Sequence, residues 1–325
     1  MKNGNALKGA IAALGMIILI SDPETALKGA ADGITSCINT VIPSLFPFIL
    51  LNCWLNDQLT GEDNWIPVRI IRAAGLPKGT VTILVSAVLG GYPTGAQAVH
   101  TAYSSGVINK TVAERILAYT NNAGPAFIFG MLGHVFPSRA APWLLWGIHI
   151  LSAFIVRLIL APSWRSIYSE TYSANKHGDI PHTTAKIMCT ICIWVTTFRI
   201  IVTYLGIWID MVVTPALKTM LFGSLELVNG CCILPEISDL GIRFIVCSGM
   251  LAFGGLCVTM QTLSVVRGLD IRYYLIGKSL QTVISIILST AFVSKKPYMI
   301  VAAFALILFF FLRIKKSGKK FRIRV

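Results

Sequence analysis

The chain has 325 residues, of which 55% are hydrophobic and only 13% are charged, and its mean hydropathy is +0.72. A soluble domain carries roughly 25% charged residues, so this chain has too few charges to cover a soluble exterior. Its continuous apolar runs approach or exceed the ~20 residues that cross a bilayer, which also excludes the short alternating strands of an outer-membrane barrel. We therefore predict an all-α, polytopic integral membrane protein of the cell (inner) membrane.

The net charge of +14 is concentrated at the end of the chain, where RIKKSGKKFRIRV holds seven basic residues. Basic residues just after an apolar run are typical of the cytoplasmic side and attract anionic lipids. No nucleic-acid-binding module adjoins this tail. We predict a cytoplasmic C-terminus, the lipid bilayer as partner and no nucleic-acid partner. The first 22 residues lack a clear cleavage site and are predicted to form an anchor or a span.

Apolar segments occupy most of the first half, and two of them are interrupted by a cluster of helix breakers. In chain order they are Leu7–Ile20, Ile34–Leu55, Val81–Tyr103, Val112–Phe136 and Trp143–Ala161. The third contains GGYPTG and the fourth TNNAGP, whose glycines and prolines disfavour a continuous helix. We predict an N-terminal membrane half over residues 1–162, in which an anchor helix precedes the first repeat.

The second half shows the same mixture of continuous and broken segments. A polar connecting loop, 163–185, precedes the runs Ile187–Ile209, Val212–Leu234, Ile242–Val266, Tyr273–Phe292 and Met299–Leu312. We predict a C-terminal membrane half over 186–312 as the second repeat, and a basic cytoplasmic tail over 313–325. GGYPTGAQ (90–97) and GGLCVTMQ (254–261) each read Gly-Gly, five residues, Gln, a match that either reflects two related halves or arises by chance in a Gly-rich chain. We predict that the two halves are related and inverted relative to each other.

The broken segments are predicted to form a solute-binding site. An unpaired backbone amide in hydrocarbon costs several kcal/mol, so unwound chain persists only under protein or beside a water-filled cavity. Broken helices in two repeats are typical of transporter sites, and we expect Gly90–Gly95 to be sheltered and to face Gly254–Gly255. A helix kink, a loop or glycine-mediated packing is the alternative at each break. The candidate substrate-binding residues are Gly91, Tyr92, Pro93, Thr94, Gly95, Gln97, Asn121, Asn122, Gly124, Pro125, Gly255, Thr259 and Gln261.

Glu226 and Asn229, in LFGSLELVNG, are also candidates, because Glu226 has apolar neighbours on both sides. An acid within a membrane segment is hypothesised to bind the substrate, a coupling proton or a cation. The alternative is a structural ion pair with Arg199 or Lys278. Arg157 and Arg199 are interpreted either as ligands or as snorkelling and helix-pairing residues.

Signatures of enzymes and cofactor sites are missing from the sequence. The five histidines show no metal-binding spacing, and neither a Walker loop nor G-x-S-x-G occurs. Cys189 and Cys192 share a helical face, where packing is favoured over zinc or redox use. We expect no enzymatic activity, no cofactor and no bound metal.

Five motifs occur in one order: VIPSLFPFIL (41–50), GGYPTGAQ, TNNAGPAFIFG, GSLELVNG and AFGGLCVTMQTLSV (252–265). Together, over most of residues 34–293, they resemble the YlbJ-type sporulation integral membrane proteins of the nucleoside-recognition, or Gate-domain, group. The resemblance implies a spore-forming Gram-positive source, a repeat-built core related to nucleoside transporters and a role in the spore envelope, notably its cortex. It implies functional positions at Gly91, Tyr92, Pro93, Gly95, Asn122, Gly124, Pro125, Glu226, Asn229, Gly255 and Gln261.

The function predicted from these observations is transport of a small polar or anionic solute, coupled to a proton or a cation, during sporulation. The alternative is a non-transporting membrane scaffold for sporulation or envelope assembly. A membrane-embedded enzyme would need a nucleophile or metal cluster that the sequence does not show. Whether the protein forms a homo-oligomer is left open.

Overall fold

The computed structural model describes residues 2–59, 68–77, 80–160, 179–209, 213–296 and 298. Among these residues short connections join many of the helices, and no strand occurs. Within this part, five helical stretches are long and apolar enough to cross a membrane. They are Pro23–Leu59, Ala141–Leu160, Ile180–Ile207, Leu240–Val265 and Arg272–Val293. The prediction of an all-α, polytopic membrane protein is confirmed.

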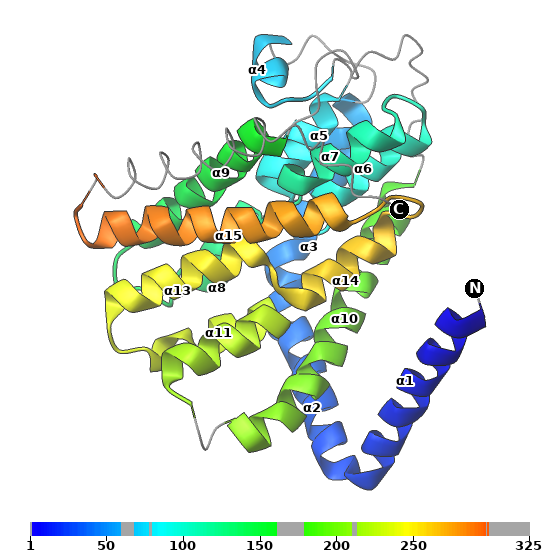
Figure 1. The fold of residues 1–325 in the computed structure, drawn as a ribbon, viewed down its shortest axis with the longest axis vertical. Helices are drawn as coiled ribbons and strands as arrows, with labels where there is room; N and C mark the ends of the chain where they lie inside the picture. Colours follow the sequence, from blue (N-terminus) through cyan, green and yellow to red (C-terminus); the bar gives the residue numbers. More distant parts are fainter. Residues whose placement is uncertain are drawn as a thin grey trace, which may run out of the picture.

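The chain begins with two helices that diverge from a tight turn (Figure 1). α1 (Lys2–Ser21) ends just before Asp22, whose carboxylate accepts a hydrogen bond from the Thr25 amide at 3.1 Å and caps α2 (Pro23–Ser36). α2 continues through a π-helical turn, η1 (Cys37–Val41), into α3 (Ile42–Leu59). The predicted run Ile34–Leu55 is therefore the middle of one 37-residue helical stretch. A short helix, α4 (Val68–Ala73), follows.

Two broken helix pairs and one continuous helix complete the first half. α5 (Val81–Val85) and the π-helical η2 (Ser86–Gly90) end at a break, after which α6 (Thr94–Ser104) begins. α7 (Lys110–Thr120) and α8 (Pro125–Leu132) flank a second break, and α9 (Ala141–Leu160) is continuous. These breaks coincide with the two predicted from glycine, proline and asparagine.

The second half follows the same order of continuous and broken helices. α10 (Ile180–Ile209) is continuous, and Glu226 separates α11 (Pro215–Leu225) from α12 (Leu227–Ile233), which ends in the turn η4 (Leu234–Glu236). Gly254 separates α13 (Leu240–Phe253) from α14 (Gly255–Val265), and α15 (Arg272–Val293) is continuous. α15 packs against α7 and α9 of the first half (Figure 1).

One predicted boundary differs from the structure. α10 begins at Ile180, so the last residues of the predicted connecting loop, 163–185, are helical. The predicted run Met299–Leu312 and the basic tail 313–325 lie outside the described residues.

The order of elements places GGYPTGAQ in the first broken pair of the first half, whereas GGLCVTMQ lies in the second broken pair of the second half. The order of elements therefore repeats, but the Gly-Gly motif does not mark equivalent positions.

Two glycines allow α2 to pack closely against α10. A Cβ atom on Gly33 would lie 2.8 Å from Cα of Thr196, and one on Gly29 would lie 2.8 Å from Cα of Ile200. Small residues four positions apart are typical of close helix contacts in membranes. The sequence GAADG thus fixes the distance between these two long helices.

The Gly33→Leu variant is expected to separate α2 from α10 and to lower the free energy of unfolding by about 1–3 kcal/mol, because a side chain has no room there. Thermal unfolding in detergent micelles measures the change. Gly9→Leu on α1 is the matched control, because nothing lies within 4 Å of a Cβ at Gly9. Equal unfolding midpoints for the two variants would contradict the close contact.

Candidate functional site

The two breaks of the first half cross each other inside the protein. All residues from Gly90 to Gly95 are buried, and Gly91 adopts φ +79°, a conformation that favours glycine. A Cβ on Gly124 would lie 2.8 Å from the Gly91 nitrogen and 3.0 Å from the Leu89 carbonyl oxygen. Backbone therefore packs on backbone at this crossing, with no room for a side chain.

Tyr92 connects this crossing to the second half. Its Oη donates a hydrogen bond to the Leu251 carbonyl at 2.8 Å. Its ring lies against Gly254, where a Cβ would be 3.2 Å from the ring carbon Cζ. Gly254 (φ +78°) ends α13 in the left-handed conformation, and Gly255 (φ +83°) begins α14. The segment Gly90–Gly95 is thus sheltered and faces Gly254–Gly255, as the sequence analysis expected.

The second break, Asn121–Gly124, is buried rather than an aqueous loop. Asn121 joins the two halves, because its Nδ2 donates to Thr262 Oγ1 at 2.8 Å while its Oδ1 accepts from the Ala96 amide at 3.3 Å. Asn122 folds back on its own helix, and its Nδ2 donates to the Tyr119 carbonyl at 2.9 Å. The Ala96 amide and the Tyr119 carbonyl lie at helix ends beside the breaks, so the two asparagines supply hydrogen bonds that a continuous helix would otherwise make.

A buried polar cluster extends from Asn122 to α15. Gln281 Nε2 donates to Asn122 Oδ1 at 3.1 Å and to the His149 carbonyl at 3.2 Å. Gln281 Oε1 accepts from Lys278 Nζ at 2.7 Å, and that amine lies 5.1 Å from the centroid of the Tyr92 ring. Lys278 is 2% exposed, and no carboxylate of the described residues lies within 4 Å of its amine. The breaks thus surround a buried amine without a paired acid.

His149 on α9 contributes to the same cluster. Its Nε2 accepts a hydrogen bond from the Ala123 amide at 3.0 Å, so this nitrogen carries no proton and a neutral ring carries its proton on Nδ1. Nδ1 is buried and makes no hydrogen bond to the described residues. Sequence reasoning did not place His149 or Gln281 at the site. Lys278 was considered only as a partner of Glu226, although a lysine within an apolar run is itself a functional signal.

Glu226 forms the break in the third pair of helices. It is 2% exposed, and its two carboxylate oxygens accept hydrogen bonds from the Val228 and Asn229 amides at 2.9 and 2.7 Å, which caps α12. Among the described residues, neither Arg199 nor Lys278 forms an ion pair with it. Arg199 instead lies 3.5 Å from a carboxylate oxygen of Asp32. The ion-pair alternative for Glu226 is therefore not what the structure shows.

The remaining candidates of the first half lie around the same breaks. Thr94 Oγ1 donates to the Gly91 carbonyl at 2.8 Å, and the Tyr92–Pro93 peptide is cis. Gly95 packs directly on the Thr120 carbonyl oxygen. Pro125 is the first residue of α8.

Gln97, on the first turn of α6, differs from these neighbours. Its Oε1 is buried and accepts no hydrogen bond from the described residues. Buried side-chain polar atoms are usually paired in folded proteins. Gln97 is thus a buried acceptor without a partner among the described residues.

The candidate substrate-binding residues of the second half do not form one cluster. Thr259 Oγ1 donates to the Gly255 carbonyl at 3.2 Å, and Gln261 Nε2 donates to Cys257 Sγ at 3.4 Å, so both bond within their own helix. Asn229 is 4% exposed, and its Nδ2 makes no hydrogen bond to the described residues. Asn229 lines a separate cavity.

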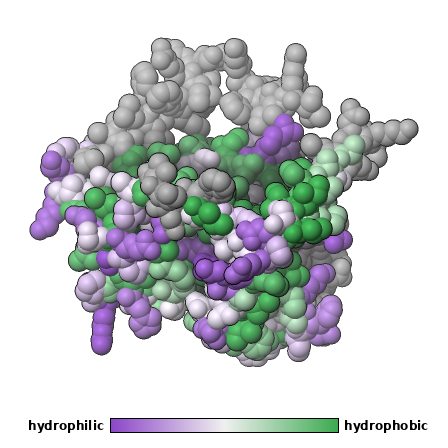
Figure 2. Space-filling view, turned by 90° about the horizontal axis from the view of Figure 1, so that it is seen from below, coloured by the Kyte–Doolittle hydropathy of each residue, from purple (hydrophilic) through white to green (hydrophobic). Residues whose placement is uncertain are grey.

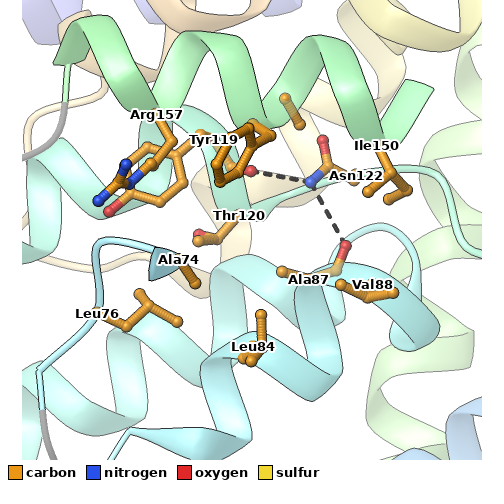
Figure 3. A pocket seen from close by; sticks show the side chains of 12 residues that line it. Ala74, Leu76, Leu84, Ala87, Val88, Tyr119, Thr120, Asn122, Ile150 and Arg157 are labelled. Carbon is orange, nitrogen blue, oxygen red and sulfur yellow. Dashed lines mark hydrogen bonds between the residues drawn. The ribbon is translucent and has the colours of Figure 1, made fainter. Parts of the chain in front are cut away.

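A small cavity of about 90 Å³ reaches the second break (Figure 3). Asn122 lies at one end, where its Nδ2 also donates to the Ala87 carbonyl at 3.4 Å, and Arg157 lies at the other end. Apolar side chains form most of the wall between them. The space has room for a few water molecules.

These features define a polytopic, all-helical integral membrane protein in which broken helices from both halves enclose a buried polar centre. The chain is 26% identical over 139 residues to the sporulation integral membrane protein YlbJ of Bacillus subtilis (strain 168). The alignment covers 39% of this chain and 32% of that protein, so the chain matches about a third of the relative's length. No family model and no solved structure matches the chain. The similarity supports a multi-pass membrane protein related to a sporulation protein.

Proposed function

We propose that the protein transports a small polar or anionic solute across the cell membrane during sporulation, and that it is not an enzyme. The observation that carries the proposal is the contact of Tyr92, in a first-half break, with Gly254 and the Leu251 carbonyl at a second-half break. Unwound backbone beside buried polar side chains offers hydrogen-bonding groups that can replace the water around a solute. The sporulation role rests on the name of the Bacillus relative.

The site of the proposed transporter is the junction of the breaks. Lys278 and His149 each present donors to this region, and Gln97 presents an acceptor. The backbone crossing at Gly91 and Gly124 leaves no space for a solute in the structure. Transport therefore requires the halves, which we propose are inverted repeats, to move relative to each other and open the junction alternately to each side.

Glu226 is proposed to carry the coupling proton or cation. It is a buried acid whose oxygens bond only to backbone amides among the described residues. A buried acid whose oxygens bond only to backbone amides gains from a proton or a metal cation. We also propose that the chain is related to the Gate-domain group and that its C-terminus is cytoplasmic.

A non-transporting scaffold for envelope assembly is the second candidate, and Gln97→Leu separates the two. The variant removes an unpaired buried acceptor, so the fold is expected to be retained with equal or higher stability. A transporter is expected to lose about tenfold or more of its flux, because the solute loses a hydrogen-bonding group. Metabolite profiles of sporulating deletion cells that carry each variant measure this loss.

The control is Gln58→Leu, at an exposed position near the end of α3. The solute that builds up in the deletion strain is expected to build up again with Gln97→Leu and to return to normal with Gln58→Leu. A Gln97→Leu strain with normal sporulation and a normal metabolite profile would favour the scaffold.

A further inference from the structure

A second and larger cavity lies between α2, α10, α11 and α12, outside the junction of the breaks. Its volume is about 480 Å³, within the range of ligand-binding pockets in proteins. Its polar lining comes from all four helices and includes Thr25, Lys28, Asp32, Arg199, Lys218 and Asn229. Gly29 and Gly33 hold α2 against α10 and so bring Lys28 and Asp32 close to Arg199.

The lining contains three cations and one carboxylate. Arg199 Nη2 lies 3.5 Å from Asp32, and Lys218 Nζ lies 3.5 Å from Glu236, which is not part of the lining. Strong charge-assisted hydrogen bonds measure about 2.7–2.9 Å, so both ion pairs are loose. No carboxylate of the described residues lies within 4 Å of the Lys28 amine. Three cations against one carboxylate give the lining itself a net positive charge.

Two buried donors of the lining have no acceptor among the described residues. They are Nε of Arg199 and Nδ2 of Asn229, whose side chain is only 4% exposed. Buried polar atoms are nearly always hydrogen-bonded, and neighbouring atoms close these two donors off, so a small rotation of the side chains would bring them to an acceptor bound in the cavity. Because the donors lie beside cations, an oxyanion such as a phosphate group satisfies both requirements.

The position of the cavity favours a phosphate that belongs to a lipid. Asp22 and Glu24 lie at the start of α2 just before the cavity residues Thr25 and Lys28, and Glu236 pairs with Lys218 of the lining. Because charges avoid hydrocarbon, we infer that the cavity lies at the level of the lipid headgroups. Seen from this end, hydrophilic residues lie directly beside hydrophobic ones (Figure 2). Ile207 lines the cavity and is 53% exposed, and Leu27 is 71% exposed next to Lys28.

We propose that this cavity binds the phosphate headgroup of an anionic phospholipid, with the acyl chains on the apolar surface beside Ile207. Basic pockets between membrane helices bind headgroups of this kind. Lys28 and Arg199 hold the phosphate, and Asn229 donates to it from the floor of the cavity. The proposal does not depend on transport, because it concerns lipid binding to the conformation described above.

The experiment uses the full chain purified in dodecyl maltoside, with dioleoyl phosphatidylglycerol added in steps. Native mass spectrometry gives the affinity for the lipid, and thermal unfolding gives the stabilisation that binding causes. Arg199→Gln and Lys28→Gln are each expected to weaken binding about tenfold or more, because each removes a charged donor to the phosphate. Arg267→Gln, at an exposed position after α14, removes the same charge and is expected to bind as the wild type does.

Two further arms identify the source of the phosphate. Dioleoyl phosphatidylcholine, with the same acyl chains and no net charge, is expected to bind at least tenfold more weakly than phosphatidylglycerol in the wild type. Glycerol 3-phosphate at matched ionic strength is expected to give no stabilisation. Stabilisation by glycerol 3-phosphate equal to that by the lipid would show a site for a soluble phosphate and overturn the lipid assignment. Equal lipid binding by Lys28→Gln, a variant of an exposed side chain, and by Arg267→Gln would overturn the site itself.

Discussion

A single methyl group at Gly124 is expected to disrupt the central crossing of the protein. In Gly124→Ala the new Cβ would lie 2.8 and 2.9 Å from the nitrogen and Cα of Gly91, and 3.0 Å from the Leu89 carbonyl oxygen. All three are backbone atoms, which cannot move aside as a side chain can. We expect the free energy of unfolding to fall by about 3 kcal/mol or more, at or above the upper end of the range for overpacked sites.

Gly147→Ala provides the control for this prediction. Gly147 lies within α9, and nothing is found within 4 Å of a Cβ built there. An alanine within a helix is favoured over glycine by about 0.5–1 kcal/mol, so this variant is expected to be as stable as the wild type or more so. Thermal unfolding in micelles and the yield of monodisperse protein compare the two variants. If Gly124→Ala unfolds at the same temperature as Gly147→Ala, the two breaks do not cross as described.

Lys278→Met is the second change with a large expected effect, and it acts on function rather than on the fold. Removing a buried amine that has no paired acid relieves a desolvation cost of several kcal/mol. The variant leaves Gln281 Oε1 without its donor, which costs about 1–3 kcal/mol. We therefore expect a folded protein whose unfolding midpoint is at or above that of the wild type, and whose proposed transport is about a hundredfold lower.

The measurement pairs thermal unfolding with the metabolite profile of sporulating cells that carry the variant. Lys186→Met, at an exposed position on α10, removes an equal charge and is expected to change neither quantity. Loss of the fold in Lys278→Met would assign a structural role to the lysine. Normal flux in a well-folded variant would remove the lysine from the proposed solute site.

The helices and their breaks could be predicted from the sequence, because hydropathy and helix breakers are local properties. Gly91, Asn121, Glu226 and Gly254 each interrupt a helix inside an apolar run, and all four positions are buried. The start of α10 within a polar stretch was missed, because the hydropathy of residues 180–185 is low while their backbone is helical. Local composition therefore defines a break more reliably than it defines where a helix begins.

The contacts between breaks could not be predicted, because they depend on how distant elements pack. Nothing in the sequence indicates that Tyr92 reaches the Leu251 carbonyl, 159 residues away. Gln281 and His149 lie in largely apolar helices, where polar side chains often bond within their own helix instead. The ion-pair alternative for Glu226 failed for a related reason, because a glutamate at a break can cap the following helix with its own carboxylate.

The helical stretch from Pro23 to Leu59 has a consequence for how the protein sits in its lipid environment. Thirty-seven residues extend about 55 Å at 1.5 Å per residue, whereas the hydrocarbon layer is about 30 Å thick. The excess must be taken up by a steep tilt or by projection of the end that carries Glu24, Lys28 and Asp32 into the interfacial region. Bilayer thickness would then set the tilt of this stretch, and through the Gly29 and Gly33 contacts it would also set the tilt of α10.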